Sequence, residues 1–117
     1  MRWGVFYHPA FADELRAMEP LVRSNLVGAF GMIEAFGPNL GRPAVDTLKG
    51  SRFSNMKELR VVVFGEPWRV AFAFDPYRRA IILVAGGKGG ISKALFYRKL
   101  IQTADKRLGE HLEGLAK

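Results

Sequence analysis

The sequence predicts an α+β domain: an antiparallel β-sheet with N-terminal helices and a C-terminal helix packed on it, in the order β-α-α-β-β-β-α. Three β-rich runs between residues 57 and 85 are separated by short turns, which is typical of an antiparallel meander. Apolar residues recur at helical spacing on either side of this region. With 117 residues, 49% of them hydrophobic, the chain is expected to form one domain over residues 1–117.

One strand and two helices are predicted before the central strands. A strand over Trp3–Tyr7 ends at His8-Pro9, because proline biases the residue before it towards extended geometry. A short helix over Ala10–Ala17 is followed by a longer one from Glu19-Pro20, since proline is well tolerated in the first turn. Gly37-Pro38 ends this second helix. Its apolar stripe consists of Val22, Leu26, Phe30 and Ile33.

Residues 38–56 are rich in turn-forming residues and are predicted to form a long loop. A loop of this length in a compact domain indicates a functional loop or a short hidden element. We expect it to arch over one end of the sheet and to carry Lys49 and Arg52.

The central strands are predicted over Lys57–Phe64, Trp68–Phe74 and Ala80–Ala85. Turns at Gly65-Glu66-Pro67 and at 75–78 connect them, and such short connections favour antiparallel pairing. The strand over Trp3–Tyr7 would complete or flank this sheet.

A last helix is predicted over Lys93–Leu115, with Ser92 as its N-cap and the flexible loop Gly86–Gly90 before it. Its apolar stripe consists of Leu100, Ile101, Ala104, Leu108, Leu112 and Leu115. Four cations lie largely off this stripe and are expected to be solvated: Arg98, Lys99, Lys106 and Arg107.

The net charge of +7 is concentrated in the second half of the chain. Residues 1–48 carry four Lys/Arg and five Asp/Glu, whereas residues 49–117 carry fourteen and six. A one-sided positive charge is expected of a protein that binds a polyanion. An acidic protein partner would exploit the same field, and a basic domain without such a partner is the plainer alternative.

The composition also bears on whether the chain has disulfides or a metal site and on where in the cell it is found. The chain has no cysteine, which excludes a disulfide framework and a thiolate metal site. His8 and His111 stand far apart with no ligand-spaced neighbours, so no metal site is expected, and His111 is interpreted as a packing residue. There is no signal-peptide pattern and no apolar run of roughly 18 residues, so we expect a cytoplasmic protein with no membrane association.

Cations on two neighbouring strands are the first candidate site. In Trp68–Phe74, alternation places Arg69 on a face whose other residues are alanines, which would leave room for a phosphate. The alternative is that Arg69 lies on a solvated face. Arg60 shares a strand face with Glu58 and is expected to pair with it, whereas Lys57 at the strand start is expected to be free for substrate.

The loop Gly86-Gly87-Lys88-Gly89-Gly90 invites comparison with a phosphate-binding loop but lacks the spacing of one. Its backbone N–H groups and Lys88 could still hold a phosphate, and a plain connector is the equal alternative. No nucleophile motif and no paired carboxylates stand in the basic half. Tyr97 is the one nearby weak acid or base.

Residues 48–112 resemble the RelE/ParE toxin superfamily, most closely its HigB-like, phage-derived branch. The resemblance rests on Leu48-Lys49-Gly50-Ser51, Met56-Lys57-Glu58-Leu59-Arg60, Trp68-Arg69-Val70-Ala71-Phe72, the Ala80–Ala85 strand and Ala104-Asp105-Lys106-Arg107-Leu108. The order of predicted elements is also similar. In this branch an aromatic residue typically precedes lysines in the loop after the third central strand, and this chain has none there.

The resemblance implies the toxin of a type II toxin–antitoxin pair, usually a ribosome-dependent mRNA endonuclease (mRNA interferase, a hydrolase). In that chemistry a ribose 2′-OH attacks the adjacent phosphate, cations stabilise the developing charge and a weak acid or base moves protons. The implied partners are mRNA, the ribosome and an acidic antitoxin with a helix-turn-helix, and no cofactor is expected. The implied catalytic residues are Lys57, Arg60, Arg69, Lys88 and Tyr97, with RNA contacts from Lys49, Arg52 and Lys93.

Two other functions stay open from the sequence. A ParE-like inhibitor of DNA gyrase would act by binding and would need no RNA-cleaving residues. A non-catalytic RNA- or protein-binding module would need only the basic surface.

Overall fold

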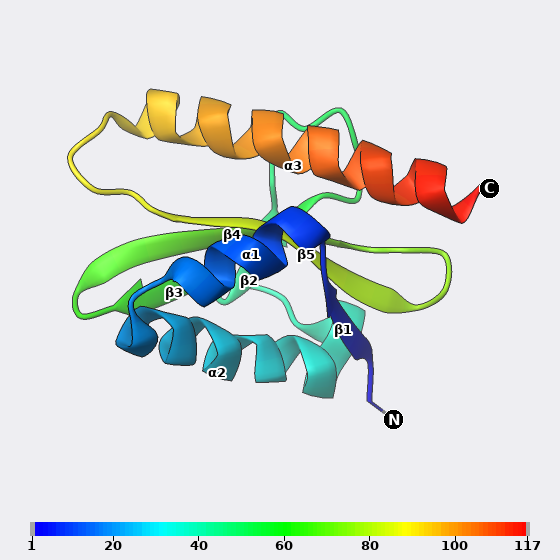
Figure 1. Ribbon diagram of the computed structural model, residues 1–117, viewed down its shortest axis with the longest axis horizontal. Coiled ribbons are helices and arrows are strands. Elements are labelled where there is room, and N and C mark those ends of the chain that lie inside the picture. The colour runs from blue at the N-terminus through cyan, green and yellow to red at the C-terminus, as the bar shows by residue number, and fades with distance from the viewer. Residues whose placement is uncertain (1, 117) are drawn as a thin grey trace.

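The computed structural model describes residues 2–116, which form a five-stranded sheet with helices on both faces (Figure 1). The predicted α+β class and element order are confirmed, with two short additions, a 3-10 helix and a strand, inside the region predicted as a loop. The elements are β1 (Gly4–Tyr7), α1 (Pro9–Ala17), α2 (Pro20–Phe36), η1 (Gly37–Asn39), β2 (Val45–Thr47), β3 (Lys57–Val63), β4 (Glu66–Phe74), β5 (Arg79–Gly87) and α3 (Lys93–Leu115).

The sheet has the strand order β1-β5-β4-β3-β2. Strands β3, β4 and β5 pair antiparallel as predicted, and β2 pairs antiparallel with β3, but β1 pairs parallel with β5. Parallel pairing is possible there because the two strands are joined through the whole intervening chain rather than by a tight hairpin. The predicted antiparallel sheet is therefore confirmed for its central strands, and β1 adds one parallel pair at this edge.

The β3–β4 hairpin turns on only two residues, Phe64 and Gly65, because Val63 already pairs with Glu66. Both turn residues have positive φ, 50° and 79°, which is typical of the type I′ turns that suit the twist of a hairpin. Glu66 and Pro67, predicted as part of the turn, belong to β4. Gly86 and Gly87, predicted as flexible loop, likewise belong to β5.

Two hydrophobic cores lie on opposite faces of the sheet. One core joins α1 and α2 to the sheet through Phe11, Leu26, Phe30 and Ile33, packed on Leu59, Val70, Phe72 and Ile82. The other joins α3 to the sheet through Phe96, Leu100, Ala104 and Leu108, packed on Ala71, Ala73, Ile81 and Leu83. The room expected beside Arg69 is therefore largely filled by α3, since the small alanines let the helix approach the sheet.

A register shift between Ala71 and Phe72 marks a β-bulge in the β4–β5 pair. As a result Leu83 and Val84, neighbours in sequence, both pack on the α3 side. Beyond the bulge Gly86 pairs with Arg69. A Cβ on Gly86 would lie 3.3 Å from the Phe96 ring, so glycine at this position lets α3 begin close to Arg69.

Helix α3 begins as predicted, because the Ser92 hydroxyl accepts a hydrogen bond from the backbone N–H of Leu95 at 3.2 Å. Arg107 is not solvated as expected: it donates to both carboxylate oxygens of Glu14 and to the Leu83 carbonyl, joining α3 to α1 and the sheet. His111 Nε2 lies 2.9 Å from the buried Asp75 carboxylate, so its role includes a polar contact as well as packing. No helix within residues 2–116 has the length and hydropathy needed to cross a bilayer.

Candidate nucleic-acid interface

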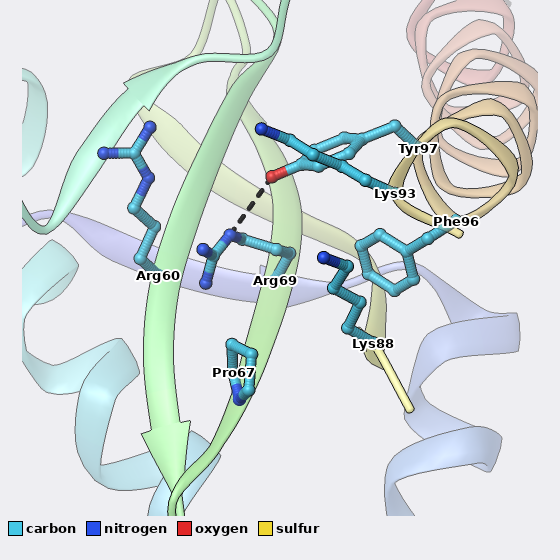
Figure 2. A pocket seen from close by; sticks show the side chains of 7 residues that line it. All are labelled: Arg60, Pro67, Arg69, Lys88, Lys93, Phe96 and Tyr97. Atoms are coloured by element: carbon cyan, nitrogen blue, oxygen red, sulfur yellow. Dashed lines mark hydrogen bonds between the residues drawn. The ribbon is translucent and has the colours of Figure 1, made fainter. Parts of the chain in front are cut away.

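A pocket of about 280 Å³ lies where the β3–β4 hairpin, the β5–α3 loop and the first turn of α3 meet (Figure 2). The part of β4 before Ala71 contributes no residue to the core under α3, so the sheet face opens there. Seven residues line the pocket: Arg60, Pro67, Arg69, Lys88, Lys93, Phe96 and Tyr97. Four of the seven carry a positive charge, which makes the pocket suited to an anion.

Arg69 is held in a fixed orientation at the centre of this pocket. Its Nε donates a hydrogen bond to the Tyr97 hydroxyl at 3.1 Å (Figure 2). One terminal nitrogen donates to the Trp68 carbonyl at 3.0 Å. The guanidinium has five N–H donors in a planar fork, so donors remain for a phosphate after these two contacts.

The Tyr97 hydroxyl is held as a neutral phenol. Burial raises the pKa of Tyr97 above its ordinary value, and the nearby Glu58 carboxylate raises it further. The Arg69 hydrogen bond opposes both effects without reversing them. Tyr97 therefore keeps its proton at neutral pH and can act as an acid.

Arg60 faces Arg69 directly across the β3–β4 pair, so the two side chains lie on the same face of the sheet. Two cations in this position repel each other. The repulsion is offset because Arg60 donates to Glu58 Oε1 at 3.1 and 3.2 Å and to Asp46 Oδ2 at 3.4 Å. The predicted Arg60–Glu58 pair is confirmed, and the Glu58 side chain that makes it is buried.

Lys88 and Lys93 supply the other charges of the pocket. Neither ammonium group has an ion-pair partner among the described residues. The loop that carries Lys88 is tied to the hairpin by a hydrogen bond from the Lys88 N–H to the Pro67 carbonyl, 3.2 Å long. Both amines are therefore available to an anionic ligand.

A second pocket of about 280 Å³ shares Arg60, Lys93 and Tyr97 with the first, and Lys49 lines it. The two pockets thus meet at these shared side chains and form one groove. We call this the basic groove. Of the residues predicted for the site, the structure brings together six: Lys49, Arg60, Arg69, Lys88, Lys93 and Tyr97.

Lys57 and Arg52 are not in the basic groove. Lys57 pairs with Phe72 and shares its strand face with Leu59, so it lies on the opposite face of the sheet from Arg60, the face covered by α1 and α2. The Arg52 guanidinium stacks on Phe53 at 4.7 Å, and a Cβ on Gly109 would lie 2.6 Å from its Nη2. Lys57, predicted as catalytic, and Arg52, predicted to contact RNA, therefore do not line the pockets that hold the other predicted site residues.

Glu58 was predicted as the partner of Arg60, whereas Asp46 is a second partner of Arg60 that sequence reasoning missed. The signal for Glu58 was its position two residues before Arg60 on one strand face. Asp46 carried no such signal, because β2 was hidden within a predicted loop and only its pairing with β3 brings Asp46 beside Arg60.

Other residues of the motifs that resemble the toxin family stabilise the fold and do not line the groove. The Ser51 hydroxyl donates to Asp105 Oδ1 at 2.5 Å, and the Arg52 N–H donates to Asp105 Oδ2 at 3.1 Å. These bonds fasten the loop before β3 to α3. Within residues 2–116 no three His, Asp or Glu side chains gather in a way that could hold a metal ion.

Comparison with known proteins places the chain in a family. Residues 13–109 match the family described as phage derived protein Gp49-like (DUF891). The chain is 48% identical over 85 residues to HigB2 and 46% identical over 84 residues to HigB3, both of Mycobacterium tuberculosis and both named as toxins. Each alignment covers 72% of this chain, but 42% of HigB2 and 71% of HigB3. The chain therefore belongs to the Gp49-like family of phage-derived proteins, within the HigB-like branch of the RelE superfamily.

Proposed function

We propose that this chain is the toxin of a toxin–antitoxin pair and that it inhibits translation as a ribosome-dependent mRNA endonuclease. The toxin role rests on the similarity to HigB2 and HigB3. The observation that carries the endonuclease proposal is the fixed Arg69–Tyr97 pair, flanked by the amines of Lys88 and Lys93 in an open pocket.

The basic groove suits attack by a ribose 2′-oxygen on the adjacent phosphorus. The new bond joins that oxygen to phosphorus while its hydroxyl proton passes to solvent water, the bond to the 5′-oxygen breaks, and the products are a 2′,3′-cyclic phosphate and a 5′-hydroxyl. Arg69, Lys88 and Lys93 would stabilise the charge that builds on the phosphoryl oxygens. Tyr97, which keeps its proton, would protonate the departing 5′-oxygen.

The same charge supports an acidic partner. A net charge of +7 favours association with an antitoxin of opposite charge, and we expect one with a helix-turn-helix encoded beside this chain. Binding over the basic groove would neutralise the toxin by excluding RNA.

Induced expression in bacteria tests the proposal. Wild-type chain should arrest growth and truncate translated messages, and Arg69→Ala should lose both effects while remaining folded by circular dichroism. Arg98→Ala removes the same charge from an exposed position outside the groove and should stay toxic. Intact messages accompanied by a DNA-damage response would instead indicate a gyrase inhibitor, and normal growth would indicate a non-catalytic binding module.

A further inference from the structure

The tip of the β3–β4 hairpin exposes apolar side chains beside the basic groove. Val62 is 69% exposed and Phe64 is 73% exposed, and Pro67 is exposed as well. Val62 pairs with Pro67, and this pair follows the Arg60–Arg69 pair on the same face of the sheet. We call Val62, Phe64 and Pro67 the hairpin tip.

Phe64 occupies a backbone conformation that does not suit it. Its φ is 50°, in the left-handed region where asparagine and glycine are favoured and bulky residues are rare. Burial of the ring does not offset the cost of this backbone conformation, because the side chain is exposed. The ring also has no aromatic partner among the described residues. A strained and exposed aromatic residue contributes little to folding, which points to a role in binding.

The hairpin tip is continuous with the basic groove. Pro67 lines the groove, and its carbonyl accepts the hydrogen bond that holds the Lys88 loop. At a rise of about 3.3 Å per strand residue, Phe64, the first residue after β3, lies at most roughly 13 Å from Arg60. A single strand whose phosphate lies in the groove can therefore reach the tip with a neighbouring base.

We propose that the hairpin tip is a stacking platform for an unpaired base of the RNA whose phosphate occupies the basic groove. This inference rests on the proposed RNA-cleaving function and adds where the base is held. Single-stranded nucleic acids are bound by cations that follow the backbone together with aromatic rings that stack on bases. The juxtaposition of Phe64 with four cations fits that chemistry, and the loop after β5 offers no aromatic residue for it.

Phe64→Asn is the decisive substitution, because asparagine followed by glycine is a preferred type I′ turn. The variant should unfold at the same temperature as wild type or higher, so a loss of binding would not reflect misfolding. Affinity is measured by fluorescence anisotropy with a short labelled single-stranded RNA and with the same strand made abasic. Tyr77→Asn is the matched control, since Tyr77 is an exposed aromatic residue in the β4–β5 turn at the other end of the sheet.

Wild type should bind the base-containing RNA roughly tenfold more tightly than Phe64→Asn does. The two proteins should bind the abasic strand alike, and Tyr77→Asn should match wild type on both strands. Equal affinity of wild type and Phe64→Asn for the base-containing strand would overturn the platform while leaving the RNA function intact, provided that Arg69→Ala still weakens binding.

Two other outcomes would also overturn the inference. If Arg69→Ala binds RNA as well as wild type does, the proposed RNA function fails and the platform fails with it. If Phe64→Asn keeps its RNA affinity but loses affinity for the acidic antitoxin, the hairpin tip is a protein-docking surface.

Discussion

Asp75 is expected to make one of the largest polar contributions to folding, and Asp75→Asn tests it. The carboxylate lies at the end of β4 with its side chain 0% exposed. It accepts hydrogen bonds from Arg79 Nε and Nη2 at 2.9 and 2.7 Å and from the backbone N–H groups of Tyr77 and Arg79. It also contacts His111 Nε2 at 2.9 Å, which ties the end of α3 to the β4–β5 turn.

The size of the effect follows from the pKa of this carboxyl. Although burial raises it, the hydrogen bonds from Arg79, His111 and the backbone outweigh burial and lower the pKa of Asp75 from 3.8 to about 2. Such a difference between the unfolded and folded chain stabilises the folded state by about 2.5 kcal/mol at neutral pH. For a chain of this length that corresponds to a fall in Tm of about 10 °C on substitution.

The pH dependence makes the prediction specific. Because the folded pKa is lowered, the stabilisation is complete above the ordinary value near 4 and is lost as the pH falls through about 2. Thermal unfolding of wild type and Asp75→Asn should therefore differ by about 10 °C at pH 7, and the two curves should converge between pH 4 and pH 2. A difference that stays constant over this range would refute the account, since it would reflect packing rather than charge.

Two further predictions concern the basic groove. Lys88→Ala and Lys93→Ala should each reduce the slope of log affinity against log salt concentration for single-stranded RNA by about 0.7, whereas Arg98→Ala should leave this slope unchanged. Equal slopes for all three variants would show that the two lysines do not contact the phosphates of the RNA. Glu58→Gln should lower the pKa of Tyr97, because the substitution removes the carboxylate that raises this pKa. Ultraviolet titration, with Tyr97→Phe as the reference, measures the change. An unchanged phenol pKa would mean that Glu58 does not act on Tyr97.

Local patterns in the sequence predicted most of the fold. The two N-terminal helices and α3 lie where proline, glycine and Ser92 place their ends. The parallel pairing of β1 with β5 was not predictable in this way, because it joins segments at least 75 residues apart, such as Gly4 and Arg79. Likewise β2 spans only three residues and gains its strand character from pairing with β3.

Which cations share the basic groove depends on the length of the turn in the β3–β4 hairpin. A three-residue turn at Gly65–Pro67 pairs Arg69 with Val63 and puts it on the face that carries Lys57. The observed two-residue turn shifts the register, pairs Arg69 with Arg60 and leaves Lys57 on the other face. A difference of one residue in the length of the turn therefore decides which cations share a groove. The sequence pattern alone did not determine the length of the turn.

We propose that Arg69 and Tyr97 act together on the phosphate of translated mRNA. The most direct measurement is a purified translation reaction in which cleaved message ends are mapped and their chemistry is identified. Wild type should produce 2′,3′-cyclic phosphate and 5′-hydroxyl ends. Arg69→Ala and Tyr97→Phe should each slow the appearance of these ends at least a hundredfold, whereas Arg98→Ala should not. Intact messages with wild type, or equal cleavage by Arg69→Ala, would contradict this proposal.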